Sequence, residues 1–183
     1  PLEAFSREKI VRQFNTNVIG LLDVTKTVLP HFRQNKKGII INISSIGGKI
    51  TFPLGSLYHG TKFAVEGISE SLNYEVEQFG GQVKIVEPGM IATDFGGRSF
   101  DFSNDENTVE YQNIVNALMT AMPTMAQNAS PASVVAKVIF AAATDGKNQL
   151  RYTAGEDAKI LIANRKQYDD ATFIGGIKSQ FGL

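Results

Sequence analysis

The sequence predicts a single α/β domain built on a parallel sheet. Short runs of β-branched residues alternate with long segments in which apolar residues recur at helical spacing. The order strand, helix, strand, helix, strand favours right-handed crossovers, which give parallel strands. The chain has 183 residues, 43% of them hydrophobic, which suffices for one buried core.

The first helix is predicted from Arg7 to about Gln34. Ser6 is a suitable N-cap, and Phe5 and Ile10 have the spacing of a hydrophobic staple. The helical pattern ends at Pro30 and the stretch 35–38. The apolar residues on its one face are Ile10, Phe14, Val18, Leu21, Leu22, Val28 and Leu29.

A strand at 39–43 and a second long helix at 56–79 follow. The strand is isoleucine throughout except for Asn42, which is typical of a strand buried on both faces in a parallel sheet. A loop with Pro53 and Gly55 precedes the helix, and Gly80 and Gly81 end it. Its apolar residues are Phe63, Ile68, Leu72, Val76 and Phe79.

The C-terminal half is predicted to add two strands and two helices. The strand 83–86 stops at Pro88 and Gly89, and 93–127 is a polar, mixed excursion with some helix. Ser130 as N-cap and Pro131 in the first turn open a helix to about 143. A strand at 149–153 and a helix at 157–166 complete the domain.

Composition excludes several classes of partner. Eighteen basic residues balance eighteen acidic ones, so no net field attracts nucleic acid or an anionic membrane. The absence of cysteine excludes disulfides and thiolate metal sites. No apolar run has the length of a membrane helix and no signal-peptide pattern is present, so a cytoplasmic protein is expected.

No metal site is predicted. His31 and His59 are the only histidines, and neither has a carboxylate at metalloprotease spacing, so both are read as surface or packing residues. The acidic run 101–107 faintly resembles a calcium loop. It has Glu106 where such loops need glycine and Gln112 at the twelfth position, and is read as a solvated loop.

Three polar residues form a candidate catalytic group. Tyr58 and Lys62 are four apart at the start of the second helix and share a face. Ser45 follows the carboxyl end of a buried strand, where open α/β sheets bind ligands. Moving a tyrosine pKa from about 10 to about 7 takes roughly 4 kcal/mol, which one ammonium near 4 Å can supply at an effective dielectric of about 20. Tyr58 is therefore expected to act as an acid and base.

These residues resemble a known family. Residues 58–62, Tyr-His-Gly-Thr-Lys, match the YxxxK signature of short-chain dehydrogenases/reductases, and residues 42–45 with Gly48 look like their strand-end serine motif. Asn17 resembles the asparagine that completes the family's tetrad. Pro88 and Gly89, followed by Thr93, look like the motif that contacts the nicotinamide. YxxxK alone is a weak pattern, but four motifs in order at the right spacing are specific.

The resemblance implies an oxidoreductase that moves hydride between NAD or NADP and a small carbonyl or secondary alcohol. Tyr58 would exchange a proton with the substrate oxygen, and Ser45 would hydrogen-bond that oxygen. Lys62 would lower the pKa of Tyr58 and bind the nicotinamide ribose, and Asn17 would link the lysine to solvent through a water. The implied cofactor contacts are Tyr58, Lys62, Pro88, Gly89, Ile91 and Thr93.

The resemblance also implies a Rossmann-type, doubly wound parallel sheet of which this chain holds the last three strands. The family's glycine-rich turn, which places pyrophosphate on a helix N-terminus, has no counterpart here. The sequence begins at Pro1 inside what reads as a loop entering a helix, which indicates a fragment. Activity is therefore expected to need the N-terminal segment.

Assembly and substrate binding are further expectations from the resemblance. The helices at 7–34 and 56–79 would pair with their copies in a homodimer or homotetramer, with Leu21, Leu22, Leu72 and Val76 as candidates for burial there. The excursion at 94–128 matches the family's variable substrate loop. Its apolar side chains either line a substrate pocket or pack the excursion onto the sheet: Phe95, Phe100, Phe102, Met119, Met122 and Met125.

Two other classes of function stay open. One is a non-catalytic binding or regulatory protein, or a truncated fragment, that keeps the fold without a cofactor site; the missing glycine-rich turn favours it. The other is a lyase or epimerase of the same broader superfamily, which shares the YxxxK pair.

Overall fold

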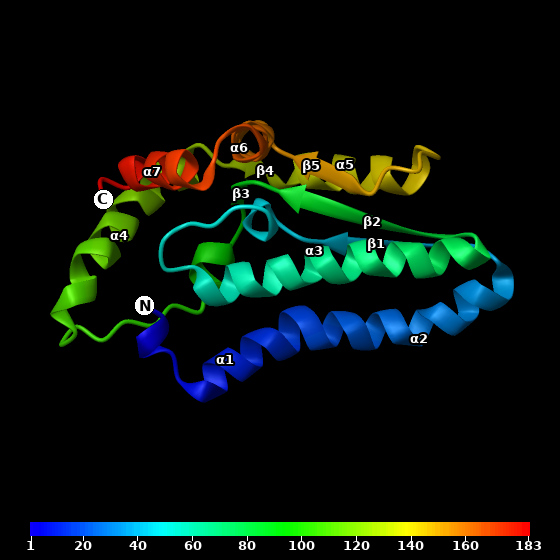
Figure 1. The fold of residues 1–183 in the computed structure, drawn as a ribbon, viewed down its shortest axis with the longest axis horizontal. Coiled ribbons are helices and arrows are strands. Elements are labelled where there is room, and N and C mark those ends of the chain that lie inside the picture. The colour runs from blue at the N-terminus through cyan, green and yellow to red at the C-terminus, as the bar shows by residue number, and fades with distance from the viewer.

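The fold is an α/β domain around a parallel sheet, as predicted. The computed structural model describes residues 1–183, with the side chain of Arg98 excepted. Strands β1 (Gly38–Ile43), β2 (Gly81–Pro88) and β5 (Arg151–Ala154) lie in the order β1-β2-β5. Gly38 is opposite Gly81 and Ile85 is opposite Arg151, and both pairings are parallel. The carboxyl ends of the strands therefore meet at one edge (Figure 1).

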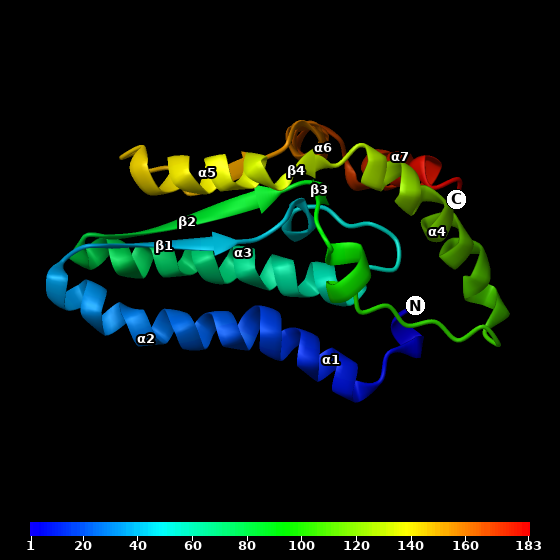
Figure 2. The same ribbon diagram turned by 180° about the vertical axis from the view of Figure 1, so that it is seen from behind.

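Helices cover both faces of this sheet. Helix α3 (Ser56–Val76) lies against one face, and α1 (Arg7–Phe14) and α2 (Gly20–Asn35) run beside it on the outside. Helix α5 (Ala132–Thr144) covers the other face, and α6 (Glu156–Gln167) follows β5 (Figure 2). The long crossover helices place the amino end of α3 beside the carboxyl end of β1.

The predicted helix at 7–34 is confirmed, with one irregularity. A π-helical turn, η2 (Asn15–Ile19), joins α1 to α2. Ser6 caps the helix, because its hydroxyl accepts the Lys9 N–H at 3.3 Å. Pro30 lies inside α2, which runs on to Asn35. The helix ends where Lys36 adopts a left-handed conformation, with φ of 51°.

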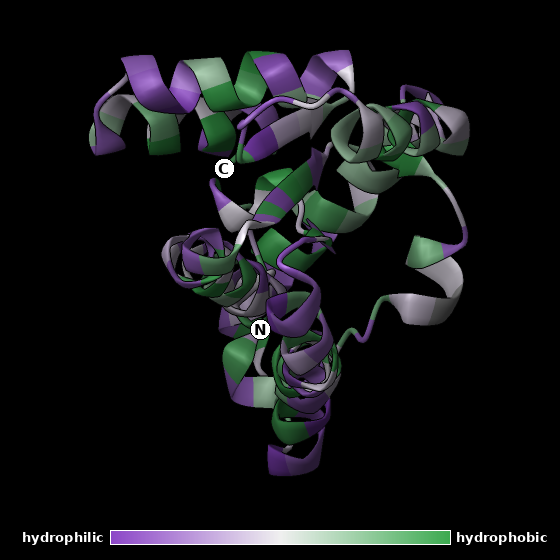
Figure 3. Ribbon diagram, turned by 90° about the vertical axis from the view of Figure 1, so that its right-hand side faces the viewer, coloured by the Kyte–Doolittle hydropathy of each residue, from purple (hydrophilic) through white to green (hydrophobic). Residues whose placement is uncertain are grey.

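The core divides into two layers, one on each side of the sheet. Because side chains alternate along a strand, neighbouring residues of β2 face opposite helices. Val83 packs under α3 with Ile40, Leu72 and Val76. Val86 packs under α5 with Ala142, Tyr152 and Ala154. Along the helices hydrophobic and hydrophilic segments alternate (Figure 3), as expected of helices with one buried side.

Two expectations about burial were wrong. The first strand was expected to be buried on both faces, but Ile39 and Ile43 are each 41% exposed. In the part of the chain that the structure describes, β1 pairs only with β2, so one of its edges is open. Leu72 and Val76 were expected at an interface between copies. They face the sheet and are buried in this chain, 8% and 1% exposed.

The C-terminal region differs most from the sequence prediction. Ser130 was expected to cap a helix, but the N-cap of α5 is Pro131, and Ser130–Pro131 is a short strand, β4, paired with β3 (Ile91–Ala92). The polar excursion contains α4 (Gln112–Gln127) and short helical turns η5 (Phe95–Ser99) and η6 (Val109–Tyr111). Helix α7 (Asp170–Gln180) is the last element. Earlier in the chain there are three further short helical turns: η1 (Leu2–Ala4), η3 (Ile46–Gly48) and η4 (Glu77–Phe79).

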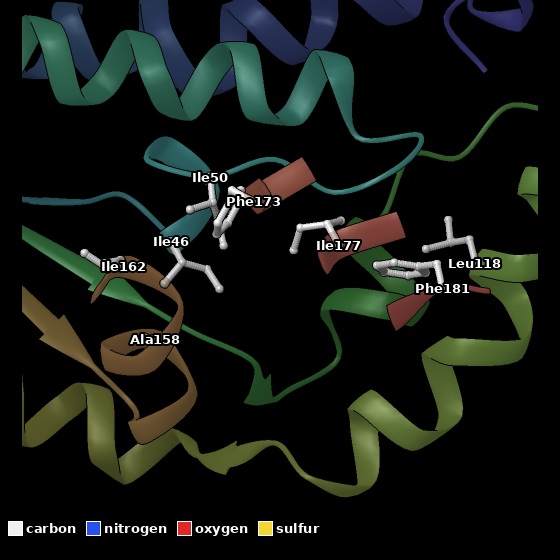
Figure 4. Close-up of a cluster of buried hydrophobic side chains, with 8 residues drawn as sticks. All are labelled: Ile46, Ile50, Leu118, Ala158, Ile162, Phe173, Ile177 and Phe181. Atoms are coloured by element: carbon white, nitrogen blue, oxygen red, sulfur yellow. The ribbon is translucent and has the colours of Figure 1, made fainter. Parts of the chain in front are cut away.

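Helix α7 was not predicted. Asp169 caps it, since its carboxylate accepts the Thr172 N–H at 2.8 Å. Gly175 and Gly176 interrupt its apolar pattern, which removes the periodic signal from the sequence. Its apolar side chains complete a third cluster with residues from η3, α4 and α6 (Figure 4): Ile46, Ile50, Leu118, Ala158, Ile162, Phe173, Ile177 and Phe181.

Candidate active site

The amino end of α3 brings two of the predicted residues to the carboxyl edge of the sheet. Tyr58 and Lys62 lie one helical turn apart, and the Lys62 ammonium is 5.9 Å from the centre of the Tyr58 ring. The same ammonium donates to the Ile43 carbonyl, the last of β1, at 3.0 Å. Burial lowers the pKa of Lys62, and the charge of Glu66 opposes that shift. The lysine is thus fixed between the helix and the strand end.

Ser45 reaches the same place from the loop after β1. It is the N-cap of η3, where its hydroxyl oxygen accepts the Gly47 N–H at 3.0 Å. It also hydrogen-bonds the Tyr58 hydroxyl, which works to lower the pKa of that phenol. The structure therefore brings Ser45, Tyr58 and Lys62 together, the arrangement expected from their spacing.

The loop approaches α3 closely because Gly48 has no side chain. A Cβ atom at Gly48 would lie 2.7 Å from the Ser44 hydroxyl oxygen, 2.8 Å from Glu66 Cγ and 2.9 Å from the Lys62 carbonyl oxygen. The Lys62 carbonyl belongs to the backbone of α3 and cannot move without shifting the helix, and the Glu66 side chain is held by its ion pair with Arg151. Glycine at this position allows the close approach between the loop that carries Ser45 and α3.

The expected lowering of the Tyr58 pKa by Lys62 was wrong for this structure. Burial raises the pKa of Tyr58, and the hydrogen bond with Ser45 is the opposing influence. The Lys62 ammonium is occupied by the Ile43 carbonyl and lies near the ring rather than bound to the hydroxyl. Desolvation therefore sets the direction of the shift, because burial disfavours the ionised phenolate.

Asn17 connects to this group through α3. Its side-chain amide donates to the Thr61 hydroxyl at 3.0 Å, and that hydroxyl donates to the Tyr58 carbonyl at 2.8 Å. Thr61 is fully buried between the two helices. Asn17 lies in the π-helical turn η2, and single π-helical turns within α-helices are frequent at functional sites. The structure places Asn17 beside the turn of α3 that carries Tyr58, but shows no direct bond to Lys62.

His59 is a supporting residue whose role sequence reasoning missed. It is 5% exposed, and its Nδ1 is 2.9 Å from the Gly47 carbonyl while Nε2 accepts the Phe52 N–H at 2.9 Å. One donor and one acceptor define a neutral ring. Burial lowers its pKa. His59 thus ties both ends of the loop 47–52 to α3, and only its place next to Tyr58 hinted at this.

A buried group of charges lies one turn beyond Lys62, between α3 and the sheet. The Glu66 carboxylate is 2.9 Å from the Arg151 guanidinium and 3.8 Å from the Lys49 ammonium. Glu87, from β2, is 3.6 Å from the same guanidinium. Burial and the charge of Glu66 raise the pKa of Glu87. We call Glu66, Glu87 and Arg151 the buried charge cluster.

The predicted cofactor contacts lie at the end of β2. The Gly89 N–H donates to the Ala154 carbonyl at 2.9 Å, and Ile91 pairs with Ser130. Thr93 is exposed, and its hydroxyl oxygen accepts the Phe95 N–H at 3.4 Å. An ammonium, a phenol, a threonine hydroxyl and backbone amides around one strand end suit ribose hydroxyls and a carboxamide. The residues present therefore fit the nicotinamide end of the predicted coenzyme.

The excursion lies against Tyr58 through a row of aromatic rings. The Phe95 ring centre is 5.6 Å from that of Tyr58, Phe100 is 6.2 Å from Phe95, and Phe102 stacks on Phe100 at 5.7 Å. Of the methionines considered for a pocket, Met122 and Met125 instead pack against the third apolar cluster, and Met119 is 40% exposed. Met122 and Met125 therefore follow the packing reading, while the substrate pocket stays a prediction for the phenylalanines next to Tyr58.

Polar contacts fasten the excursion to α1. The Lys9 ammonium is 3.0 Å from the Asp101 carboxylate and 2.8 Å from the Ser103 hydroxyl, and Arg12 also pairs with Asp101. The run that faintly resembled a calcium loop is a local turn, since Asp105 accepts the Asn107 N–H at 3.0 Å. Among the described residues no group of acidic or histidine side chains has the arrangement of a metal site.

No helix of the described chain has the length and hydropathy to cross a membrane.

The chain is similar in sequence and fold to several known proteins. The profile of the short chain dehydrogenase family matches residues 1–104. An uncharacterized oxidoreductase of Schizosaccharomyces pombe is 45% identical over 183 residues, covering 100% of this chain and 76% of the relative. A short-chain dehydrogenase from Streptomyces avermitilis superposes with a TM-score of 0.77 at 29% identity, over 99% of this chain and 65% of that one. ElxO with NADP bound superposes at 0.62 with 25% identity, over 84% of this chain and 59% of that one.

Proposed function

This chain belongs to the short-chain dehydrogenase family of oxidoreductases, and we propose that it carries the acid–base centre of an enzyme that interconverts a carbonyl and a secondary alcohol with NAD or NADP. The observation that carries the proposal is the meeting of three side chains at the carboxyl edge of the sheet. Tyr58 hydrogen-bonds Ser45, and the Lys62 ammonium lies beside the Tyr58 ring. Hydroxyl, phenol and ammonium together are the groups that proton exchange with a substrate oxygen requires.

In the proposed reduction, Tyr58 donates its phenolic proton to the carbonyl oxygen and Ser45 hydrogen-bonds the same oxygen. Lys62 holds its positive charge near the ring and so stabilises the phenolate that forms. In the oxidation Tyr58 removes the proton from the alcohol. Because burial raises the pKa of Tyr58, the protonated phenol is the resting form, which suits the donor role in reduction.

The coenzyme would lie along the carboxyl edge of β1 and β2. Bound there, NAD(P)H supplies the hydride. Lys62 and Tyr58 would hold ribose hydroxyls, and Thr93 with the backbone from Pro88 to Ile91 would hold the carboxamide. The solved structure of ElxO with NADP bound, similar to this chain, supports a nicotinamide coenzyme.

Replacing Tyr58 by Phe tests the assigned role. In the intact protein we expect NAD(P)H-dependent reduction to fall by about a thousandfold or more, because general acid catalysis is lost together with the bond to Ser45. Coenzyme affinity, measured by NAD(P)H fluorescence, should change by only a few-fold. The control is Tyr74→Phe, on the same helix but 66% exposed and remote from the site. Near-normal turnover by Tyr58→Phe would refute the proposal.

We further propose that the excursion at 94–128 forms the substrate side of the site. The aromatic row beginning at Phe95 touches the Tyr58 ring and offers an apolar surface next to the proton donor. Removing the Phe95 ring should raise KM for carbonyl compounds with a bulky apolar group by about tenfold, and less for small aliphatic ones. Equal effects of Phe95→Ala on both substrate types, measured by steady-state kinetics, would count against this placement.

A further inference from the structure

The turn after β2 is held by hydrogen bonds to three different elements. The Gly89 N–H donates to the Ala154 carbonyl of β5 at 2.9 Å, and the Met90 carbonyl accepts the Ser130 N–H of β4 at 2.9 Å. The Met90 N–H donates to a carboxylate oxygen, Oδ2 of Asp157 in the first turn of α6, at 2.7 Å. Met90 is therefore fixed on both sides of its Cα, once by a side chain from far along the sequence.

The Asp157 carboxylate fits between two glycines. A Cβ atom at Gly89 would lie 2.3 Å and 2.4 Å from its two oxygens, and one at Gly155 would lie 2.5 Å from Oδ1. Gly155 also has a φ of 112°, a conformation that favours glycine. Any side chain at either position would displace the carboxylate. Both glycines thus leave space for this one acid.

The carboxylate has few partners for a buried group. In the part of the chain that the structure describes, Oδ1 is buried with no hydrogen-bond partner. Its negative charge lies in the first turn of α6, where the helix dipole favours an anion. Capping α6 would not require contact with another segment. The short bond to Met90 therefore points to a function in the turn after β2.

We propose that Asp157 is a positioning residue for coenzyme binding, acting through the Met90 amide. The inference rests on the proposed function, in which the backbone of 88–91 and Thr93 hold the nicotinamide carboxamide. Because the Met90 N–H is bound to Asp157, it does not compete with the neighbouring amides for the coenzyme. The same bond fixes the orientation of the following peptide, so that the backbone of Ile91 faces the site.

The experiment combines two readouts on the intact protein. Hydrogen exchange at the Met90 amide, followed by NMR without coenzyme, tests the clamp itself. Fluorescence titration with NADH and NADPH, together with kcat and KM, tests its effect on the coenzyme. In Asp157→Ala we expect Met90 exchange to accelerate by about tenfold or more and coenzyme affinity to fall about tenfold. Asp157→Asn keeps an oxygen that accepts the Met90 N–H, and should restore both within about threefold.

Two further variants complete the design. Glu156→Ala is the matched control, because Glu156 lies next to Asp157 in the same turn, is exposed and pairs only locally with Lys159. It should change neither readout. If Asp157→Ala fails to fold, Asp157→Ser keeps a polar first-turn residue whose oxygen is too short to reach Met90, and takes its place.

The outcomes separate the clamp from the proposed function. Unchanged Met90 exchange overturns the inference, and so does faster exchange with unchanged coenzyme affinity. Equal loss in the Asn and Ala variants also overturns it, because the charge rather than the hydrogen bond would then matter. If even the unsubstituted protein binds neither coenzyme, the proposed function fails, and the inference fails with it whatever Met90 does.

Discussion

At the scale of single residues, the protonation of Tyr58 is set by opposing influences. Burial keeps the phenol protonated, while the bond to Ser45 draws its pKa down. Lys62 is itself affected by burial, and Glu66 one turn on helps it to stay charged. The identities of Ser45, Tyr58 and Lys62 were predictable from their spacing. The direction of the tyrosine pKa was not, because it depends on how much water the fold removes around the ring.

His59 makes stability depend on pH. Its pKa in the folded protein is lowered below 6.5, so the unfolded chain binds a proton more readily. The contribution of His59 to the free energy of unfolding should therefore be constant above about pH 6.5. It should fall as the pH drops below that value, until the ring is also protonated in the folded protein. Protonation also removes the acceptor of the Phe52 N–H. Urea midpoints measured from pH 8 to pH 5 should show this decline.

The matched variant for this prediction is His59→Asn. Because buried hydrogen bonds are lost, the free energy of unfolding of this variant at pH 7 should be about 2 kcal/mol lower than that of the unsubstituted protein. Because it lacks the titrating ring, its urea midpoint should change less between pH 7 and pH 5. A decline as steep as that of the unsubstituted protein would show that another group is responsible.

At the scale of elements, the site depends on how closely η3 packs on α3. Gly48→Ala would insert a methyl group 2.8 Å and 2.9 Å from atoms of α3. We expect a loss of about 1–3 kcal/mol in stability, typical of overpacking, and a fall in kcat of about tenfold or more, because Ser45 moves with the loop. Thermal unfolding and steady-state kinetics on the intact protein measure the two effects.

Gly67→Ala is the control for Gly48. Gly67 lies in the same helix, and a Cβ there meets nothing within 4 Å. Alanine is a better helix former, so this change should stabilise α3 by up to about 1 kcal/mol and leave kcat unchanged. A similar loss of activity in both variants would mean that flexibility of α3, rather than the close approach at Gly48, controls the site.

Elements were predictable where their local pattern was strong. The helix at 7–34 and the helix at 56–79 carry long apolar stripes, and both are present. Helix α7 was missed because its glycines weaken the stripe, and its stability comes from packing Phe173 and Ile177 on distant residues. Strands β3 and β4 are two residues each and exist only because the chain brings Ile91 beside Ser130. Strands this short leave no recognisable pattern in the local sequence.

At the scale of the whole molecule, we propose that copies associate through the outer face of α1, α2 and α3. Leu72 and Val76 face the sheet, so other residues must form the contacts between copies. Exposed apolar side chains on these helices are Val11, Phe14, Ile19, Val24, Phe63 and Tyr74. Phe63 is 46% exposed, and replacing it by a charged residue should disrupt this association. The mass measured by light scattering after gel filtration should then halve.

Phe140→Glu is the control for this assembly prediction. Phe140 is 70% exposed on α5, which covers the opposite face of the sheet. It should leave the mass unchanged. A monomeric unsubstituted protein, or an equal effect of both charges, would contradict the proposed interface.

The order β1-β2-β5 is a finding of the structure, whereas the parallel pairing of these strands followed from the sequence, because right-handed crossovers give parallel strands. The alignment of α3 over that sheet did not, since many helix positions satisfy an apolar stripe. The buried charge cluster supplies the missing information. Arg151 contacts two acids one turn apart on α3, Glu66 at 2.9 Å and Glu70 at 2.5 Å, and so binds the helix at two points. Moving α3 by one turn, about 5.4 Å, would break this pair of contacts, at several kcal/mol for a buried charge that loses its partner. These ion pairs favour one position of α3 along the sheet, and with it one distance between Tyr58 and the strand ends.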